Sequence, residues 1–149
     1  MMISAFTSQW RPLSNFSLHP ATYDGVEYPT AEHAFAAAKT LDVGKRVAIL
    51  AASGPARAKQ MGRRVTLRPD WDSHIRMEAM EEIVWSKFVR PGEPRETLIA
   101  TGDAVLVEGN TWHDNFWGVC HCGRLACAGG ENYLGRCLMW VRRNMPEAT

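Results

Sequence analysis

Two charged side chains on one predicted helix are the first candidates for chemistry. Glu32 and Lys39 lie within the segment PTAEHAFAAAK, which runs from Pro29 to Lys39. At about 100° of rotation per residue, both fall on one line along a helix, at the edge of an apolar stripe. A carboxylate and an amine at the rim of a cleft suit acid–base or nucleophilic catalysis, and the alanines between them leave room for another group to approach. The plainer alternative is a surface ion pair worth roughly 0.3–0.5 kcal/mol.

A second candidate segment, EGNTWHDNFWG, combines carboxylates with large aromatic side chains in a predicted loop. It runs from Glu108 to Gly118 and contains Asp114, a second candidate acid or base. Trp112 and Trp117 offer flat faces that suit stacking on a heterocycle attached to a sugar. For one of the two tryptophans, filling the core from the loop is the simpler interpretation.

Two further segments suit binding rather than catalysis. In RPLSNF, which ends at Phe16, Arg11 is a candidate phosphate partner and Asn15 a candidate hydrogen-bond partner of a base or ribose. Turn formation is the alternative role of the asparagine. In AGGENYLGR, two glycines precede a predicted helix, whose N-terminal N–H groups would face an anion. Glu131 opposes that interpretation because it would repel a phosphate.

The cysteines are concentrated in one short stretch, CHCGRLAC. The four cysteines are Cys120, Cys122, Cys127 and Cys137. The spacing C-x-C followed by four residues and a third cysteine is not the paired C-x-x-C pattern of common zinc sites, although His113 and His121 could add nitrogen ligands. We therefore expect no stoichiometric metal, a reduced loop, and Cys137 buried as a small apolar side chain. No other cofactor is expected, because no P-loop or dinucleotide-binding motif is present.

Bulk properties indicate one ordinary globular domain spanning residues 1–149. The chain is 46% hydrophobic and 22% charged, with a formal net charge of +1. That charge gives no general attraction to nucleic acid or membranes. The N-terminus lacks a signal-peptide pattern, and no window approaches the roughly 18 apolar residues of a membrane span, so we expect a cytoplasmic protein. No feature indicates an oligomeric state.

Local signals predict a mainly α fold with a minor β component. Residues 1–29 are predicted to be extended and rich in turns, and residues 109–131 to form a long loop of the kind that is commonly functional. The predicted strands are Ala21–Tyr23, Val26–Tyr28 and Ala104–Val107, and the first two form a hairpin. The predicted helices are Ala31–Thr40 with Thr30 as N-cap, Val43–Ala52, Ala56–Arg63, one from Asp72 or Ser73 to about Phe88, Arg95–Thr101 and Asn132–Arg143.

Five of these segments, taken in order, resemble the NADAR family, which is named for NAD and ADP-ribose. They are LSNFS (13–17), DG-x-x-YPTAEHAFAAAK (24–39), VWSKF (84–88), LVEGNTWHDNFWG (106–118) and ENYLGRCLMWVR (131–142). The resemblance implies a compact, mainly helical fold and cleavage of N-glycosidic bonds to ribose phosphates. The CHCGRLACAGG stretch departs from the plainer loop common in the family.

The resemblance to the family also implies roles for individual residues, in addition to those inferred from residue chemistry. Its acidic and aromatic motif positions correspond to Glu32, Trp85, Glu108, Asp114, Trp117 and Asn132, and Lys39 closes the first motif. The candidate catalytic residues are Glu32, Lys39 and Asp114. The candidate substrate-binding residues are Arg11, Asn15, Phe16, Trp85, Glu108, Trp112, Trp117, Gly118 and Asn132.

The resemblance implies two substrate classes that carry ribose on an exocyclic amine. One is the ribosylamino-pyrimidine intermediates of riboflavin synthesis, and the other is ADP-ribosylated guanine, including guanine within nucleic acid. Two alternatives to an enzyme remain: a non-catalytic ADP-ribose or NAD-binding module, and a zinc-stabilised nucleic-acid adaptor built around CHCGRLAC. Tight product binding without turnover would indicate the first alternative, and stoichiometric zinc the second.

Overall fold

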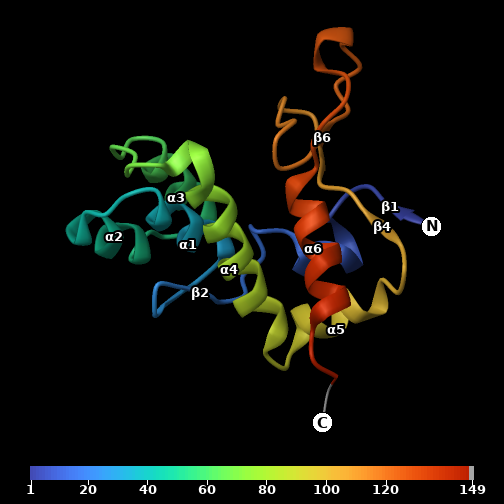
Figure 1. The fold of residues 1–149 in the computed structure, drawn as a ribbon, viewed down its shortest axis with the longest axis horizontal. Coiled ribbons are helices and arrows are strands. Elements are labelled where there is room, and N and C mark those ends of the chain that lie inside the picture. Colours follow the sequence, from blue (N-terminus) through green and yellow to red (C-terminus); the bar gives the residue numbers. More distant parts are fainter. Residues whose placement is uncertain (148–149) are drawn as a thin grey trace. The chain divides into compact units, whose positions relative to one another are not determined.

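The structure is a computed structural model that describes residues 1–147 of the chain. It confirms a mainly helical fold with short strands (Figure 1). The chain divides into two compact units, one of residues 15–90 and one that joins residues 1–14 to the chain from residue 91 onward. The single domain indicated by composition stays a prediction. None of the described helices has the length and apolar composition needed to cross a membrane.

The unit of residues 15–90 begins with the predicted hairpin. β2 (Ala21–Tyr23) and β3 (Val26–Tyr28) pair antiparallel, with Ala21 opposite Tyr28. Asp24 and Gly25 between them have φ values of 50° and 79°. Left-handed conformations at both turn residues are what a two-residue type I′ turn requires, and Asp-Gly is a favoured pair for it.

Helix α1 (Ala31–Ala38) begins at the predicted cap. The Thr30 side chain accepts a hydrogen bond of 3.1 Å from the backbone N–H of His33. The His33 ring is 1% exposed, and its two nitrogens contact Thr30 Oγ1 at 2.7 Å and the Ala52 carbonyl at 3.1 Å. Because both polar atoms have partners, this buried histidine is a structural residue.

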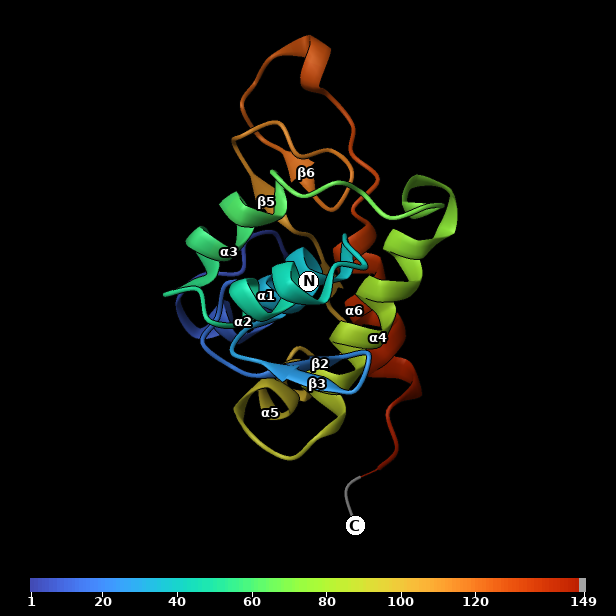
Figure 2. The ribbon, with the colours of Figure 1, turned by 90° about the vertical axis from the view of Figure 1, so that its left-hand side faces the viewer.

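Three further helices pack with the hairpin around α1: α2 (Val43–Leu50), α3 (Pro55–Gly62) and α4 (Arg76–Val89) (Figure 2). The predicted bounds of α2 and α3 are confirmed to within two residues. The predicted cap of α4 is wrong. A π-helical turn, η2 (Trp71–Ile75), precedes it, and Ser73 Oγ donates to the Asp70 carbonyl. Asp70 has a φ of 60°, a backbone state that the sequence did not indicate.

The second unit contains two pairs of parallel strands, of which the sequence predicted one strand, Ala104–Val107, confirmed as β4, but neither pairing. β1 (Met2–Ile3) pairs with β4 (Val105–Leu106), and β5 (Gly109–Asn110) pairs with β6 (Val119–Cys120). Two 3₁₀ helices, η1 (Ser8–Leu13) and η3 (Leu125–Cys127), were likewise not predicted. The stretch 109–131 is therefore an organised loop and not a structureless one.

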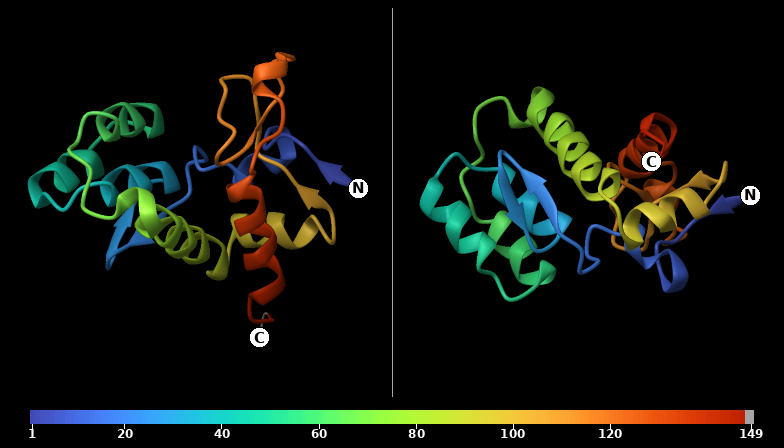
Figure 3. Two further views of the ribbon diagram at one scale, coloured as in Figure 1. Left: turned by 45° about the horizontal axis from the view of Figure 1, so that its top comes forward. Right: turned by 90° about the horizontal axis from the view of Figure 1, so that it is seen from below.

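Helices α5 (Glu93–Ala100) and α6 (Tyr133–Asn144) complete this unit (Figure 3). α5 begins two residues before its predicted start, with Pro94 in the first turn, where proline lacks no needed donor. In α6, Leu134, Leu138 and Val141 are buried, whereas Met139 is half-buried. Cys137 is only half-buried, so its predicted burial is wrong.

Candidate active site

Helix α1 presents a single partly exposed line that carries the two predicted catalytic residues. Every residue of α1 except Glu32 is buried, and Lys39, the C-cap, is half-buried. This confirms the alignment expected from helical spacing. The alanines leave no room for a ligand, however, because they pack against neighbouring elements. A Cβ added to Gly62 of α3 would lie 2.8 Å from Ala36 Cβ, so the two helices nearly touch.

The environment of Lys39 lowers its pKa. Burial is the largest cause, because it disfavours the ammonium form. Glu32 opposes this shift, while the positive charges of Arg63 and Lys59 add to it. Glu32 is therefore close enough to stabilise the charged form of the Lys39 amine.

Two cations from α3 and its end accompany Lys39, and the sequence analysis missed both. They are Lys59, whose Nζ lies 5.6 Å from the centroid of the Phe16 ring, and Arg63, the C-cap of α3. The Lys39 Nζ itself lies 5.7 Å from the centroid of the Phe35 ring. The basic run in PARAKQMGRR was the available signal, but it resembles an ordinary solvated helix face. Three positive groups beside one carboxylate suit a substrate that carries phosphate.

The candidate binding residue Asn15 lies at the start of α1. The Glu32 backbone N–H donates to the Asn15 carbonyl at 3.1 Å, so Asn15 adjoins Glu32. The Asn15 side chain donates to Met80 Sδ at 3.5 Å, which is a weak contact. Asn15 and Phe16 thus lie near Glu32 and Lys59 within the same unit.

A buried lysine on α4 is a third residue that the sequence analysis missed. Lys87 is 1% exposed, and its Nζ donates to Ser17 Oγ at 2.9 Å. A buried ammonium is costly unless it is hydrogen-bonded, so this bond fixes the motif LSNFS against the motif VWSKF. The sequence feature that could have revealed Lys87 is its position on the same apolar face of α4 as Val84. Trp85, in the same motif, is half-buried.

In the other unit, Asp114 organises the loop that carries it. Its Oδ1 accepts hydrogen bonds from the backbone N–H groups of Phe116 at 3.1 Å and Trp117 at 2.9 Å. The Asn110 side chain bonds both backbone polar groups of Asp114, at 3.1 Å and 2.8 Å. The predicted catalytic carboxylate therefore has a clear structural role.

Variants of Asp114 separate the two roles of this carboxylate. We expect Asp114→Asn to keep the melting temperature within about 2 °C, because an amide oxygen can still accept both bonds. Asp114→Ala removes the acceptor and should cost about 1–3 kcal/mol, measured by denaturant unfolding. A hundredfold rate loss in a stable Asp114→Asn variant would assign the negative charge to catalysis, and an equal instability of both variants would contradict the hydrogen-bonding argument.

At the start of α6, the Asn132 side chain forms hydrogen bonds with the backbone near Glu108. The Asn132 side chain accepts from the Glu108 backbone N–H at 3.0 Å and donates to the Leu106 carbonyl at 2.9 Å. Asn132 has a φ of 52°, which asparagine tolerates better than most residues. Its amide thus holds the end of β4 against α6, while the half-buried Glu108 follows Val107, the residue after β4.

The aromatic residues of this loop differ in exposure. Trp112 is 61% exposed and Trp117 is half-buried. The Trp117 ring meets Phe116 edge-on, with centroids 4.7 Å apart, and Phe116 also meets Tyr133 at 4.8 Å. Trp112 therefore does not fill the core. Arg11, the candidate phosphate partner in η1, is exposed.

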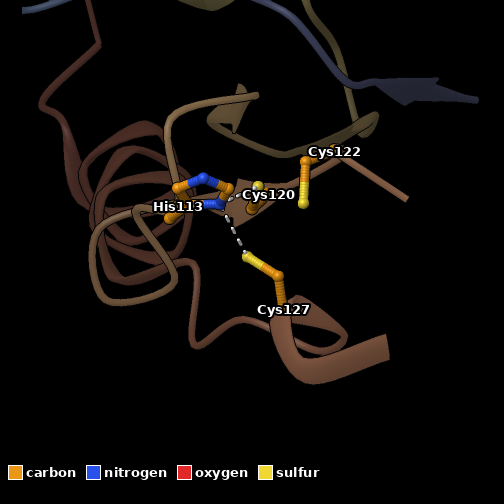
Figure 4. A group of neighbouring side chains, drawn as sticks. All are labelled: His113, Cys120, Cys122 and Cys127. Atoms are coloured by element: carbon orange, nitrogen blue, oxygen red, sulfur yellow. Dashed lines mark hydrogen bonds between the residues drawn. The ribbon is translucent and has the colours of Figure 1, made fainter. Parts of the chain in front are cut away.

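The same loop brings a histidine and three cysteines together (Figure 4). The ligand atoms of His113, Cys120, Cys122 and Cys127 all lie within 4.8 Å of one another, and His121 is not in the group. Partial burial raises the pKa of Cys120, but hydrogen bonds from Cys127, Cys122 and His113 outweigh it and lower the pKa to about 6. The bond to Cys120 and, after it, burial raise the pKa of Cys127 to about 11.

Comparisons with known proteins cover nearly the whole chain. Residues 3–146 match the family model of the NADAR domain. The chain is 39% identical over 149 residues to a protein of Nostoc punctiforme named as an N-glycosidase, covering 94% of this chain and 90% of that one. It is 38% identical to the N-glycosidase YbiA of Escherichia coli K12, covering 89% and 79% of the two chains.

Two further comparisons concern structure and a longer relative. The NMR structure of E. coli YbiA matches with a TM-score of 0.80 at 34% identity, covering 96% of this chain and 82% of that one. A Vibrio vulnificus protein named as a riboflavin biosynthesis protein is 36% identical over 137 residues, which cover 91% of this chain and 35% of that protein.

Proposed function

The chain belongs to the NADAR domain family, and we propose that it is an N-glycosidase acting on a phosphorylated ribose. The observation that supports this function best is the partly exposed line of α1, where Glu32 and Lys39 lie together and the charge of Glu32 acts on the Lys39 amine. The relatives named as N-glycosidases give the reaction class. The catalytic steps are proposed from the side chains of this chain, as follows from Glu32 and Lys39.

Glu32 is proposed to stabilise the positive charge that develops on the sugar. Cleavage of an N-glycosidic bond passes through an oxocarbenium-like state, and a nearby carboxylate lowers the energy of that state. Glu32 is anchored for this task, because its own backbone N–H is held by the Asn15 carbonyl.

Lys39 is proposed to act as the nucleophile. When ribose is attached to an exocyclic amine, its ring can open to an imine at the anomeric carbon. The neutral Lys39 amine adds to that carbon, its two protons pass to the nitrogen of the base, the base leaves as a neutral amine, and a Schiff base to lysine remains. Water then adds to this imine and releases the sugar aldehyde and free Lys39. The lowered pKa of Lys39 supports this route, because it increases the share of neutral amine.

The phosphate of the substrate is proposed to bind beside these residues. Lys59 and Arg63 both lower the pKa of Lys39, so they are close enough to place positive potential at the same point. A phosphate bound to Lys59 and Arg63 would reduce the extent to which they lower the pKa of Lys39, and it would orient the sugar. Asp114 remains a candidate for a second carboxylate, to be judged by the variants described above.

Two substrate classes carry ribose on an exocyclic amine and fit this chemistry. The name of the Vibrio relative favours a ribosylamino-pyrimidine of riboflavin synthesis. ADP-ribosylated guanine, free or within nucleic acid, is the second. Incubation of the purified chain with each compound, followed by chromatography for released base and for ribose phosphate or ADP-ribose, distinguishes them. Binding of either without release would support a non-catalytic module instead.

Glu32→Gln is the control for this assay and a prediction in itself. The change keeps the shape of the side chain and removes its charge, so we expect turnover to fall at least about a hundredfold. Stability should change little, because Glu32 is the only residue of α1 that is not buried. Circular dichroism and the chromatographic assay measure the two effects. A variant as active as the parent would mean that the activity belongs to another residue or to a contaminant.

A further inference from the structure

We propose that His113, Cys120, Cys122 and Cys127 bind one zinc ion, which braces the loop between β5 and α6. The spacing of these residues in the sequence favoured a metal-free loop, and the three-dimensional arrangement reverses that preference. Four ligand atoms converge, and all of them belong to one compact unit. Three thiols and one imidazole form a ligand set that zinc prefers in structural sites.

The distances within the group match a tetrahedral metal site. With Zn–S near 2.3 Å and Zn–N near 2.0 Å, tetrahedral ligands lie about 3.5 Å apart for sulfur and nitrogen and about 3.8 Å apart for two sulfurs. His113 Nδ1 lies 3.4 Å from Cys127 Sγ and 3.7 Å from Cys120 Sγ. Because all separations in the group lie within 4.8 Å, binding requires a contraction of at most about 1 Å, which small side-chain rotations provide.

The backbone is shaped to bring these ligands together. Cys120 lies in β6, whose pairing with β5 fixes its position, and Cys127 ends η3. His113 has a φ of 70°, and Gly123 between the second and third cysteines has a φ of 85°. A left-handed histidine costs energy and persists only where its surroundings compensate, and a metal bond supplies that compensation.

Asn115 supports the proposed ligands from outside the group. Its side-chain N–H₂ donates to Cys127 Sγ at 3.1 Å and to the Cys127 carbonyl at 3.3 Å. Its side-chain oxygen accepts from the Cys120 backbone N–H at 2.9 Å. Hydrogen bonds of this kind orient metal ligands and stabilise thiolate charge. Asn115 directly follows Asp114, so the four proposed ligands are linked through Asn115 to the turn that carries Trp117.

The loop needs such a brace because its side chains bury little apolar surface. Leu125 is 94% exposed, and Trp112 is 61% exposed. Between β6 and α6, Cys127 is the only buried residue. A zinc ion would replace the missing hydrophobic core of the loop, as structural zinc does in small domains.

Metal content and cobalt spectroscopy test the proposal directly. The protein is expressed with added zinc, purified under reducing conditions and analysed for metals, and we expect about one zinc per chain. Replacement of zinc by Co²⁺ should give thiolate-to-cobalt charge-transfer absorption and the intense d–d bands of a tetrahedral site. Less than about 0.1 metal per chain, together with no charge-transfer band, would overturn the site, and iron in place of zinc would overturn the choice of metal.

Matched variants identify the ligands. Cys122→Ser and His113→Ala should lower zinc affinity at least about tenfold in a chelator competition, or lose zinc entirely. His121→Ala and Cys137→Ser change the same residue types outside the group and should keep one zinc. If Cys122→Ser fails to fold, the cobalt spectrum of His113→Cys still tests the position, because a fourth thiolate should intensify the charge-transfer band. Equal zinc loss in the ligand variants and in the controls would contradict the assignment.

The zinc test is independent of the proposed enzyme activity. Zinc content and the cobalt spectrum are measured without substrate, whereas the glycosidase assay depends on residues of the other unit. Zinc bound by a protein that releases no base would leave the brace established and contradict the proposed reaction. The reverse outcome would overturn the zinc site alone.

Discussion

Replacement of Lys39 by arginine is expected to lower the rate of N-glycoside hydrolysis at least about a thousandfold, as removal of a covalent nucleophile does. Arginine keeps the positive charge but stays protonated, so it cannot form the Schiff base. Borohydride added during turnover should trap a covalent adduct on the parent chain and none on Lys39→Arg, as measured by intact mass. Retained activity in Lys39→Arg would instead show that water attacks the sugar directly and that the lysine only binds anions.

The pH dependence of the rate follows from the same assignment. The attacking amine must be neutral, and burial, followed by the charges of Arg63 and Lys59, holds the pKa of Lys39 below its usual 10.5. The rate should therefore be low when Lys39 is protonated and should rise as pH rises through that lowered pKa. Lys59→Gln removes one of the positive charges, so the rise should move to higher pH. A shift in the opposite direction would contradict this electrostatic picture.

Gly118→Ala is expected to destabilise the protein by about 3 kcal/mol or more, a large value for a single methyl group. A Cβ at this position would lie 2.0 Å from the Glu108 carbonyl oxygen and 3.0 Å from Asn110 Nδ2. That carbonyl accepts the Val119 N–H at 2.9 Å, where β5 and β6 come together. The methyl group therefore displaces backbone, not a flexible side chain. Gly118, expected from the sequence to bind substrate, has a steric role here.

Gly102→Asn is the matched control for this steric argument. Gly102 has a φ of 59°, and a Cβ there would meet no atom within 4 Å. Asparagine tolerates the left-handed conformation, so the variant should lose less than about 1 kcal/mol. Thermal and urea unfolding of both variants measure the difference. Similar stability losses in the two variants would contradict the proposed backbone clash.

The sequence by itself determined the features that depend on neighbouring residues. Asp24-Gly25 predicted the hairpin because its turn needs two left-handed residues. Thr30 predicted the start of α1 because its side chain satisfies a free N–H three residues later. The single line of Glu32 and Lys39 followed from helical periodicity. These signals are local, so the final packing of the chain did not change them.

Tertiary structure decided the features that depend on residues far apart in the chain. Parallel pairing of β1 with β4 joins segments about a hundred residues apart, and two-residue strands leave no periodic pattern to detect. Lys59 and Arg63 adjoin Lys39 because Gly62 and Ala36 let two helices meet closely. The choice of His113 over His121 depended on how the loop folds back toward Cys127. In each of these three cases, the residues come together through packing or through a reversal of the chain. Neither can be read from the residues next to one another in the sequence.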